Sequence, residues 1–223
     1  MLSPKRIALF CGHYGSGKTN AAVNYALWLK ATGKDVAVAD MDIVNPYFRT
    51  KDSEDDLNKA GIELISPHFA NSNVDLPSLP QELYGLFQRK ERNVVLDIGG
   101  DDRGAYALGR YTPYILEENN FDCFFVANFY RPLTRTAQEA LEVMREIEIA
   151  GKVPFTGIIN NSNIGEDTTK EDVEKTFPIA EELSVLTGLP VVMVTAEESI
   201  AKSIDAPFVL PMKLQSKYWN VNA

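Results

Sequence analysis

The chain has 223 residues, of which 45% are hydrophobic and 24% charged, and this composition is typical of one globular domain with a full hydrophobic core. Its formal net charge of −9 disfavours direct binding to nucleic acids, whose phosphate backbones require a basic surface. No apolar run approaches the roughly 18 residues that cross a bilayer, and the N-terminal MLSPKR leads into a strand rather than a signal peptide, so we expect a cytoplasmic protein without direct membrane binding.

The first predicted strand, Ile7–Cys11, is followed directly by the sequence GHYGSGKT. This sequence matches the pattern G-x-x-x-x-G-K-[ST], in which glycines let the backbone N–H groups wrap a phosphate chain. Lys18 is expected to reach the β and γ oxygens, Thr19 to coordinate Mg²⁺, and the helix that begins near Lys18 to present its positive end to the same anion. The predicted nucleotide-binding residues of this loop are Gly12, His13, Tyr14, Gly15, Ser16, Gly17, Lys18 and Thr19.

A glycine-rich turn can match such a pattern by chance. Here an apolar strand precedes the loop, and apolar residues recur at helical spacing after it, from Ala21 to Leu29. Lys30 and Gly33 are typical of a helix end. The strand, loop and helix together therefore favour a phosphate-binding loop.

A second predicted strand, Val36–Ala39, ends in Asp40-Met41-Asp42. Ligands of parallel sheets bind at the carboxyl ends of the strands, so Asp40 and Asp42 are well placed to face a metal ion or a water molecule. The alternative is that these aspartates begin a solvated loop or cap a helix.

Residues 52–60 are predicted to form a short polar helix, and Ile62–Ser66 a further strand. The Pro67–Pro80 segment then follows, with little periodicity. Segments of this length in compact domains are often functional, but a plain surface loop has the same character. The sequence leaves its role open.

The next predicted strand, Asn93–Asp97, is an apolar run that ends in an acid. This is the Walker B form, in which the carboxylate lies beside Mg²⁺ on the side opposite Thr19. Gly99 and Gly100 follow directly, and a glycine here can sense a γ-phosphate and let the loop rearrange. An ordinary strand-to-helix turn would contain the same two glycines.

The rest of the chain alternates strands and helices, which is typical of a parallel sheet covered on both faces. Helices are predicted over Leu83–Arg89, Ala105–Glu118, Leu133–Ile149, Glu171–Thr187 and Glu198–Ile204. Strands are predicted over Cys123–Ala127, Phe155–Ile159 and, as the last core strand, Val191–Val194. Cys11 and Cys123 both lie in apolar runs, so we interpret them as small core residues rather than a disulfide or metal ligands.

Several features in chain order resemble the MinD/ParA-like P-loop ATPases, which belong to the CobQ/CobB/MinD/ParA nucleotide-binding group of the SIMIBI class. They are the loop, the paired aspartates followed by Pro46, the Asp97 strand, a strand followed by Pro132 and a helix, and the strand Gly-Ile-Ile-Asn. The resemblance extends from Ile7 to about Thr195 and implies a three-layer α/β fold, with a mostly parallel sheet and helices on both faces. Residues 1–223 would then form a single P-loop nucleotide-binding domain.

The resemblance also implies an ATP-driven switch that acts on a partner protein or cargo, with ATP and Mg²⁺ as cofactors. Carried over by position, Lys18 and Asp42 are the catalytic residues, Thr19, Asp40 and Asp97 lie around Mg²⁺, and Asn160 contacts the base. Asp42 would orient the attacking water in this scheme.

The loop departs from the family pattern K-G-G-x-G-K-[ST], whose first lysine reaches the nucleotide of the partner subunit. His13 stands at the position of this lysine, and Tyr14 replaces the next glycine. Because an imidazole is shorter than a lysine side chain, we expect His13 to contact a phosphate within its own subunit. Tyr14 adds bulk between the subunits, so we expect that any homodimer is not driven by a nucleotide shared between the two loops.

Two other classes of function stay open. The first is a small-molecule kinase or ligase, in which the Pro67–Pro80 loop and Arg103, Arg110 and Arg131 would hold an acceptor. The second is a nucleotide-binding module without turnover. A kinase lid usually carries several arginines on the phosphates, and the sequence has no dense arginine cluster.

The run Asn160-Asn161-Ser162-Asn163 lines up with the N-K-x-D sequence that selects guanine in many GTPases. The aspartate of that sequence accepts two hydrogen bonds from guanine, whereas Asn163 is an amide with a single acceptor oxygen. We therefore predict a preference for adenine.

Overall fold

The computed structural model describes residues 3–42, 50–66, 82–100 and 102–213, with the backbone alone for residues 51, 52, 102, 103 and 105. Within them, eight strands form a single sheet in the order β3-β2-β4-β1-β5-β6-β7-β8, and every described pairing is parallel. The strands are β1 (Ile7–Cys11), β2 (Val36–Met41), β3 (Glu63–Ile65), β4 (Asn93–Ile98), β5 (Phe121–Ala127), β6 (Gly157–Asn160), β7 (Val191–Glu197) and β8 (Val209–Met212). The predicted Pro67–Pro80 loop lies outside the described residues.

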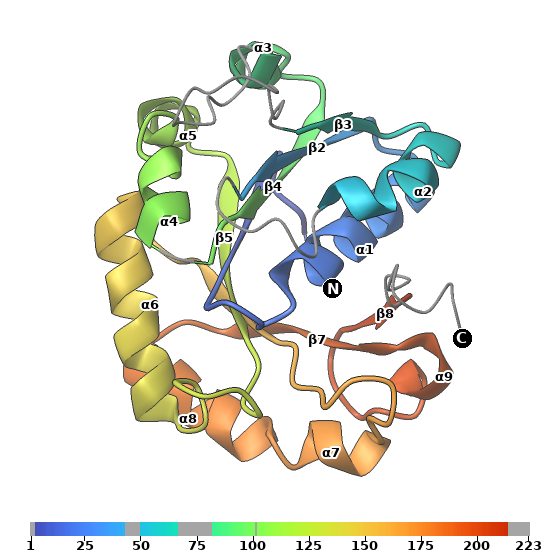
Figure 1. The fold of residues 1–223 in the computed structure, drawn as a ribbon, viewed down its shortest axis with the longest axis vertical. Coiled ribbons are helices and arrows are strands. Elements are labelled where there is room, and N and C mark those ends of the chain that lie inside the picture. The colour runs from blue at the N-terminus through green and yellow to red at the C-terminus, as the bar shows by residue number, and fades with distance from the viewer. Residues whose placement is uncertain (1–2, 43–49, 67–81, 101, 214–223) are drawn as a thin grey trace, which may run out of the picture.

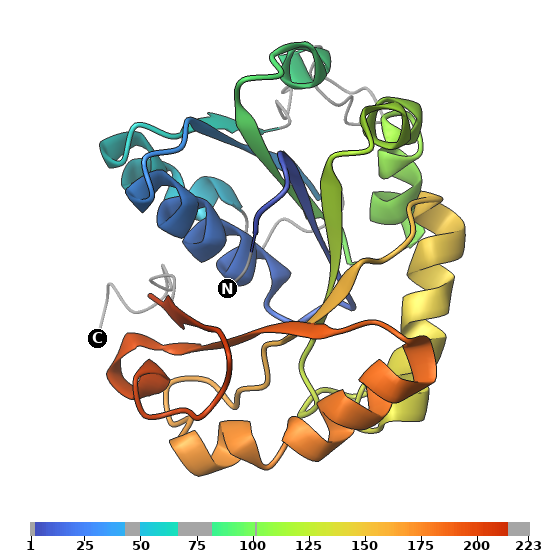
Figure 2. The same cartoon turned by 180° about the vertical axis from the view of Figure 1, so that it is seen from behind.

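Helices follow most of the strands in the chain. They are α1 (Lys18–Ala31), α2 (Glu54–Lys59), α3 (Glu82–Gln88), α4 (Asp102–Leu108), α5 (Thr112–Glu118), α6 (Ala137–Gly151), α7 (Lys170–Glu174), α8 (Phe177–Thr187) and α9 (Glu198–Ala201), with a short 3₁₀ helix, η1 (Thr50–Ser53), before α2. Figures 1 and 2 show α1 and α2 on one side of the sheet and α4, α5 and α6 on the other.

The sheet separates two hydrophobic cores, and β1 contributes to both. Ile7, Leu9 and Cys11 pack with residues of α3, α4, α5, α6 and α8, whereas Ala8 and Phe10 pack with α1 and α2. Successive side chains of a strand point to opposite faces, so a strand that is covered on both sides is apolar throughout. The predicted three-layer α/β fold is therefore confirmed.

The order of the strands brings the phosphate loop, Asp40 and Asp97 together at the carboxyl ends of neighbouring strands. β1 lies between β4 and β5, so the strand that precedes the phosphate loop is next to the strand that carries Asp97. β2 pairs with the other side of β4, in a register that places Asp40 opposite Asp97. The phosphate loop follows β1, and the two acids lie in the last residues of β2 and β4, so all three are at the carboxyl ends of neighbouring strands.

Two predicted helices are each divided in the structure. Residues 105–118 form α4 and α5 rather than one helix, and residues 171–187 form α7 and α8. Pro113 lies in the first turn of α5, and Pro178 lies in the first turn of α8. A proline is favourable there because the first N–H groups of a helix have no partner in the helix, whereas in a helix interior it would remove a hydrogen bond.

Two further boundaries differ from the sequence prediction. α6 begins at Ala137 rather than at Leu133, because Thr136 and Glu139 form a reciprocal capping box. Leu133 itself has a φ of +68°, which a right-handed helix excludes. The last strand is β8 rather than Val191–Val194, and it pairs along the second half of β7.

Cys11 and Cys123 are buried in the core as predicted, with their Sγ atoms 4.0 Å apart. Burial, followed by the neighbouring Cys11, raises the pKa of the Cys123 thiol well above its usual value, so this thiol has little nucleophilic character. None of the described helices combines the length and the apolar character that a membrane span requires.

Candidate nucleotide site

The phosphate loop connects β1 to α1 in a conformation that only glycine allows at several positions. Gly15 and Gly17 have φ angles of +77° and +84°, in the left-handed region. A β-carbon on Gly17 would overlap the side chain of Asn161, and one on Gly12 would overlap the carbonyl oxygen of Val126. Gly17 is the N-cap of α1 and no side chain caps this end, so the backbone N–H groups of the first turn are available to an anion.

Lys18 lies in the interior of the site. Its side chain is buried, and a β-carbon placed on Gly100 would lie 2.7 Å from Lys18 Nζ and 2.9 Å from the backbone nitrogen of Tyr14. The loop after β4 therefore rests against both the ammonium group and the phosphate loop. A side chain larger than hydrogen at Gly100 would push the two loops apart.

Asp97 is the centre of a small hydrogen-bonded group. Its Oδ2 atom accepts a bond of 2.7 Å from the hydroxyl of Thr19 and one of 3.0 Å from the hydroxyl of Thr50. Its Oδ1 atom is buried, and none of the described residues forms a hydrogen bond with it. A buried carboxylate oxygen without a partner is costly unless a ligand or cation compensates for it.

The electrostatic environment of Asp97 also favours a bound cation. Burial raises the pKa of Asp97 above its usual value and the charge of Asp42 adds to this effect, while Lys18 and the hydroxyls of Thr19 and Thr50 oppose it only in part. Ionisation of Asp97 is therefore less favourable in the protein alone than that of an ordinary carboxyl group in water. A bound cation would stabilise it.

These donors fit Mg²⁺, which prefers oxygen ligands and keeps several waters beside one or two carboxylates and the phosphates of a substrate. In the part of the chain that the structure describes, no three side chains of His, Cys, Asp or Glu come together as a metal cage. A shell built from Thr19, Asp97, water and phosphate oxygens would need no such cage. The unpartnered Oδ1 atom supports this interpretation.

The aspartates after β2 lie beside this group. Asp40 is buried opposite Asp97 in the paired strands, and its Oδ1 atom accepts a bond of 2.9 Å from the backbone N–H of Asp42. Asp42 is also buried, and a β-carbon on Gly99 would lie 3.3 Å from its Oδ1 atom. The structure thus brings Asp40, Asp42 and Asp97 together around the loops that carry Lys18 and Thr19.

His13 and Tyr14 occupy the outer part of the phosphate loop. Nδ1 of His13 lies 3.0 Å from the carbonyl oxygen of Tyr14, and the carbonyl of His13 accepts a bond of 3.1 Å from the N–H of Ser16. The Tyr14 side chain is 56% exposed. Contact of either side chain with a nucleotide stays a prediction.

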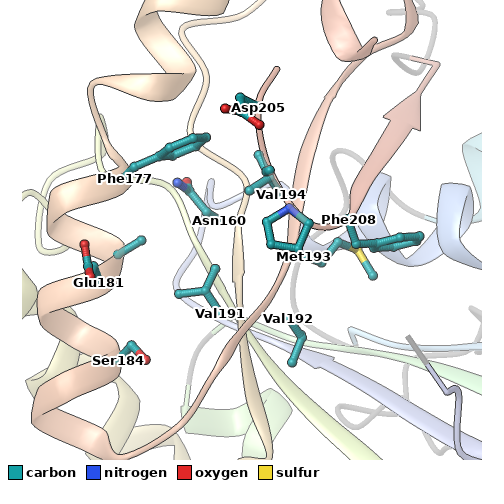
Figure 3. Close-up of a pocket in the computed structure, with 13 residues that line it drawn as sticks. Asn160, Phe177, Glu181, Ser184, Val191, Val192, Met193, Val194, Asp205 and Phe208 are labelled. Atoms are coloured by element: carbon teal, nitrogen blue, oxygen red, sulfur yellow. The ribbon is translucent and has the colours of Figure 1, made fainter. Parts of the chain in front are cut away.

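The structure does not bring Asn160 to the phosphate loop. Its amide nitrogen donates to the hydroxyl of Thr176 at 2.8 Å, and its oxygen accepts from the N–H of Ser162 at 3.1 Å. Asn160 instead lines a cavity of about 400 Å³ between α8 and β7, where Figure 3 shows it between Phe177 and Val194. Contact of Asn160 with the base therefore remains a prediction without support from this geometry.

The next residue, Asn161, is the amide that reaches the loop. Its nitrogen donates to the carbonyl oxygen of Ser16 at 2.6 Å, and its oxygen accepts from the hydroxyl of Thr195. Because neighbouring residues of an extended strand point to opposite faces, only one of the two asparagines can face the loop. Asn163, two positions further, uses its amide within the turn, where it contacts Gly165 N–H and the carbonyl of Asn161.

Sequence reasoning missed Thr50, Asn161 and Thr195. Asn161 belongs to the run that lines up with N-K-x-D, in which the resemblance gives the nucleotide contact to Asn160 and no role to Asn161. Thr50 is not part of a recognisable motif, and it lies 47 positions before Asp97 in the chain. The sequence carried no signal for that contact.

A family model for the CobQ/CobB/MinD/ParA nucleotide binding domain matches residues 7–197. The chain belongs to this family. As a member of the CobQ/CobB/MinD/ParA family it is a P-loop nucleotide-binding protein, and the matched region contains the phosphate loop, both strand-end acid groups and the asparagines after β6.

Solved structures with a similar fold include the cell division protein FtsY from Thermotoga maritima, with a TM-score of 0.57 and 17% identity over 89% of this chain and 64% of that one. The signal recognition particle receptor FtsY from Elizabethkingia anophelis, in complex with GDP, has a TM-score of 0.54 and 12% identity over 87% of this chain and 58% of that one. The signal recognition particle 54 kDa protein from Aeropyrum pernix, also in complex with GDP, has a TM-score of 0.53 and 15% identity over 87% of this chain and 42% of that one.

At these identities the similarity shows the fold alone. This member of the CobQ/CobB/MinD/ParA family spans between 42% and 64% of the length of those three proteins. No curated protein matches its sequence significantly.

Proposed function

We propose that this protein is a cytoplasmic ATP-dependent switch, with residues 1–223 as a single domain, that binds ATP with Mg²⁺ and hydrolyses it to change its contact with a partner protein or cargo. The observation that carries this proposal is the buried carboxylate of Asp97: Thr19 donates to one of its oxygens, no described residue bonds to the other, and the charge of Lys18 acts on it. A P-loop without turnover would not need acids placed as Asp40 and Asp42 are.

Each charged residue has a separate role in this proposal. The Lys18 ammonium neutralises the phosphates. Thr19 and Asp97 hold Mg²⁺, and Asp40, which lies opposite Asp97 in the paired strands, is near the ion. When bound, the ion would neutralise charge on the transferred phosphoryl group. Asp42 orients the attacking water by accepting a hydrogen bond from it.

The loop after β4 supplies the conformational response. Gly100 packs against Lys18 and Tyr14, so a γ-phosphate bound to Lys18 would lie close to this loop. Gly99 lies so close to Gly104 at the start of α4 that a β-carbon on either residue would overlap the other. Movement of Gly100 would therefore be transmitted to α4.

ATP is the proposed nucleotide because the run Asn160-Asn161-Ser162-Asn163 ends in an amide where the N-K-x-D sequence of many GTPases ends in a carboxylate. GTP is the second candidate, since two proteins of similar fold were solved with GDP. Of the arginines that could serve a kinase, Arg110 follows α4 and Arg131 follows β5, and neither is among the described partners of Lys18 or Asp97. Measuring transfer of phosphate to candidate acceptors, in parallel with its release to water, would separate a kinase from a switch.

The proposed partner is a protein, and any homodimer uses a surface other than two facing phosphate loops. Tyr14 projects from the loop with 56% of its surface exposed. A second loop that approached Tyr14 face to face would have to displace this ring.

Phosphate release by the Asp42→Ala variant tests the proposed chemistry. The variant should release phosphate at least about tenfold more slowly than the wild type, while its affinity for ATP stays within about threefold, because orientation of the water matters mainly in the transition state. Glu146→Ala, which removes an exposed acid from α6, is the matched control and should hydrolyse normally. Hydrolysis by Asp42→Ala at the wild-type rate would remove Asp42 from the mechanism.

A further inference from the structure

We propose that Thr50 is a positioning residue for the magnesium site, whose hydroxyl holds the Asp97 carboxylate so that Oδ1 is left for the cation. This inference rests on the proposed function, because it requires that Mg²⁺ binds beside Thr19 and Asp97. Thr50 is the first residue of η1, and it is fully buried. It lies in neither the phosphate loop nor the Walker B strand.

The division of hydrogen bonds on Asp97 is the first observation. Both hydroxyls, from Thr19 and Thr50, donate to the same oxygen, Oδ2, and the other oxygen accepts no hydrogen bond within the part of the chain that the structure describes. A carboxylate can turn about its Cβ–Cγ bond, and two donors that reach one oxygen from different elements restrict this rotation. The unpartnered oxygen is then held in one place.

The use of protons is the second observation. A threonine hydroxyl has one proton to donate, and Thr50 gives its proton to Asp97. Thr19 can coordinate a cation through an oxygen lone pair while it still donates to Asp97. Of the two side-chain hydrogen bonds that described residues donate to this carboxylate, the bond from Thr50 is therefore the one whose donor does not itself contact the proposed ion.

The position of η1 is the third observation. η1 packs against α1 and β2, the two elements that carry Thr19 and Asp40. The contact of Thr50 with Asp97 thus connects the chain after the β2 aspartates to the metal side of the site. Groups that hold metal ligands in this indirect way typically change metal affinity by about 10–100-fold when they are removed.

The test compares Thr50→Val, which keeps the shape of threonine but has no donor, with Thr50→Ser, which keeps the donor. Binding of a methylanthraniloyl derivative of ATP is followed by fluorescence, with Mg²⁺ titrated and with EDTA in place of Mg²⁺. Thr50→Val should need roughly tenfold more Mg²⁺ for half of the magnesium-dependent change. The affinity of Thr50→Val for the nucleotide in EDTA should stay within about threefold of the wild type. The Mg²⁺ concentration at which Thr50→Ser shows half of the change should also stay within about threefold of the wild-type value.

Thr112→Val is the matched control. Thr112 is another buried threonine, and its hydroxyl donates to the carbonyl of Gly151 at 2.8 Å, on α5 and away from the site. A purely structural role predicts a lower melting temperature for both valine variants and the same magnesium midpoint.

The outcomes separate the two proposals. Thr50→Val with a wild-type magnesium midpoint would overturn the role of Thr50 and leave the proposed function intact. An equal shift in Thr112→Val would also overturn it. Wild-type protein that binds the nucleotide equally in Mg²⁺ and in EDTA would overturn the magnesium site of the proposed function, and the role of Thr50 with it.

Discussion

Asn161 is the side chain that fixes the phosphate loop to the rest of the sheet. It is buried, with its amide nitrogen on the carbonyl of Ser16 and its amide oxygen on the hydroxyl of Thr195. Both polar groups of the amide are therefore satisfied, one by the loop after β1 and the other by β7. The close approach of this amide to Gly17 also explains why a side chain at position 17 would not fit.

Substitution of the two neighbouring asparagines tests which of them serves the nucleotide. Asn161→Ala should weaken nucleotide binding roughly tenfold, because the loop loses a buried hydrogen bond of about 1–2 kcal/mol that holds its shape. Asn160→Ala should lower stability by a similar amount, because it removes the buried hydrogen bonds of this side chain with Thr176 and Ser162, but should keep nucleotide affinity within about threefold. Calorimetry with ATP, in parallel with urea denaturation, measures both quantities. A loss of affinity in Asn160→Ala alone would restore Asn160 as the residue that contacts the base.

The local residues of the site could be predicted from the sequence, and the distant ones could not. Lys18 and Thr19 follow from the spacing of one loop, and Asp97 follows from an apolar run that ends in an acid. Thr50 and Thr195 reach the site through contacts between elements that are far apart in the chain. Such contacts depend on the order of the strands, and no local pattern encodes them.

At the scale of elements, Arg6 joins the start of β1 to α3 and α5. Its Nη1 atom donates to the carbonyl oxygens of Leu86, Arg89 and Arg92, at 3.2, 3.3 and 2.9 Å. Its guanidinium also forms an ion pair with Glu118 in which both side chains are buried. Arg6 therefore satisfies carbonyl groups around the end of α3 while Glu118 balances its charge.

Glu118 should make the stability of the protein depend on acid pH. Burial raises its pKa, but the hydrogen bonds and charges of Arg6 and Lys90 outweigh burial, and the net pKa is lowered. A carboxyl with a lowered folded pKa stabilises the fold above its unfolded pKa of about 4.3, and this stability is lost as the pH falls through the folded value.

The Glu118→Gln variant measures this contribution. Urea denaturation at pH 7 should show a loss of about 3 kcal/mol relative to the wild type, since the buried Arg6 charge loses its partner. The difference should shrink as the pH falls below about 4.3, where the carboxyl becomes neutral in the unfolded chain, and should continue to shrink until the folded carboxyl is neutral as well. Glu117→Gln, at a neighbouring exposed acid, serves as control. A difference that stays constant from pH 7 to pH 3 would contradict the role of the ion pair.

The boundaries of elements were harder to predict than the elements themselves. The periodicity of the apolar residues extends through Leu133, whereas the capping box of Thr136 and Glu139 sets the true start of α6. That box was visible in the sequence as T-x-x-E, but apolar periodicity favoured the longer helix. Pro113 and Pro178 likewise mark helix starts within apolar patterns that continue across the break.

At the scale of the whole molecule, the sheet is packed between two hydrophobic cores and holds the proposed catalytic groups at the carboxyl ends of its strands. The neighbouring strands β2, β4 and β1 end in Asp40, Asp97 and the phosphate loop, respectively. The membership of the CobQ/CobB/MinD/ParA family agrees with this arrangement. The proposal that follows is a switch in which the nucleotide joins the three strand ends.

Isothermal titration calorimetry of the wild-type protein and of Lys18→Ala, with ATP and with GTP in the presence of Mg²⁺, tests this proposal most directly. The wild type should bind ATP, and more tightly than GTP, while Lys18→Ala should lose at least about tenfold in affinity because a charge-assisted contact with the phosphates is removed. Lys202→Ala, which changes an exposed lysine after α9, should bind as the wild type does. Binding of GTP at least as tight as that of ATP would contradict the preference for adenine. An affinity of Lys18→Ala equal to that of the wild type, or no binding of either nucleotide by the wild type, would contradict the nucleotide site itself.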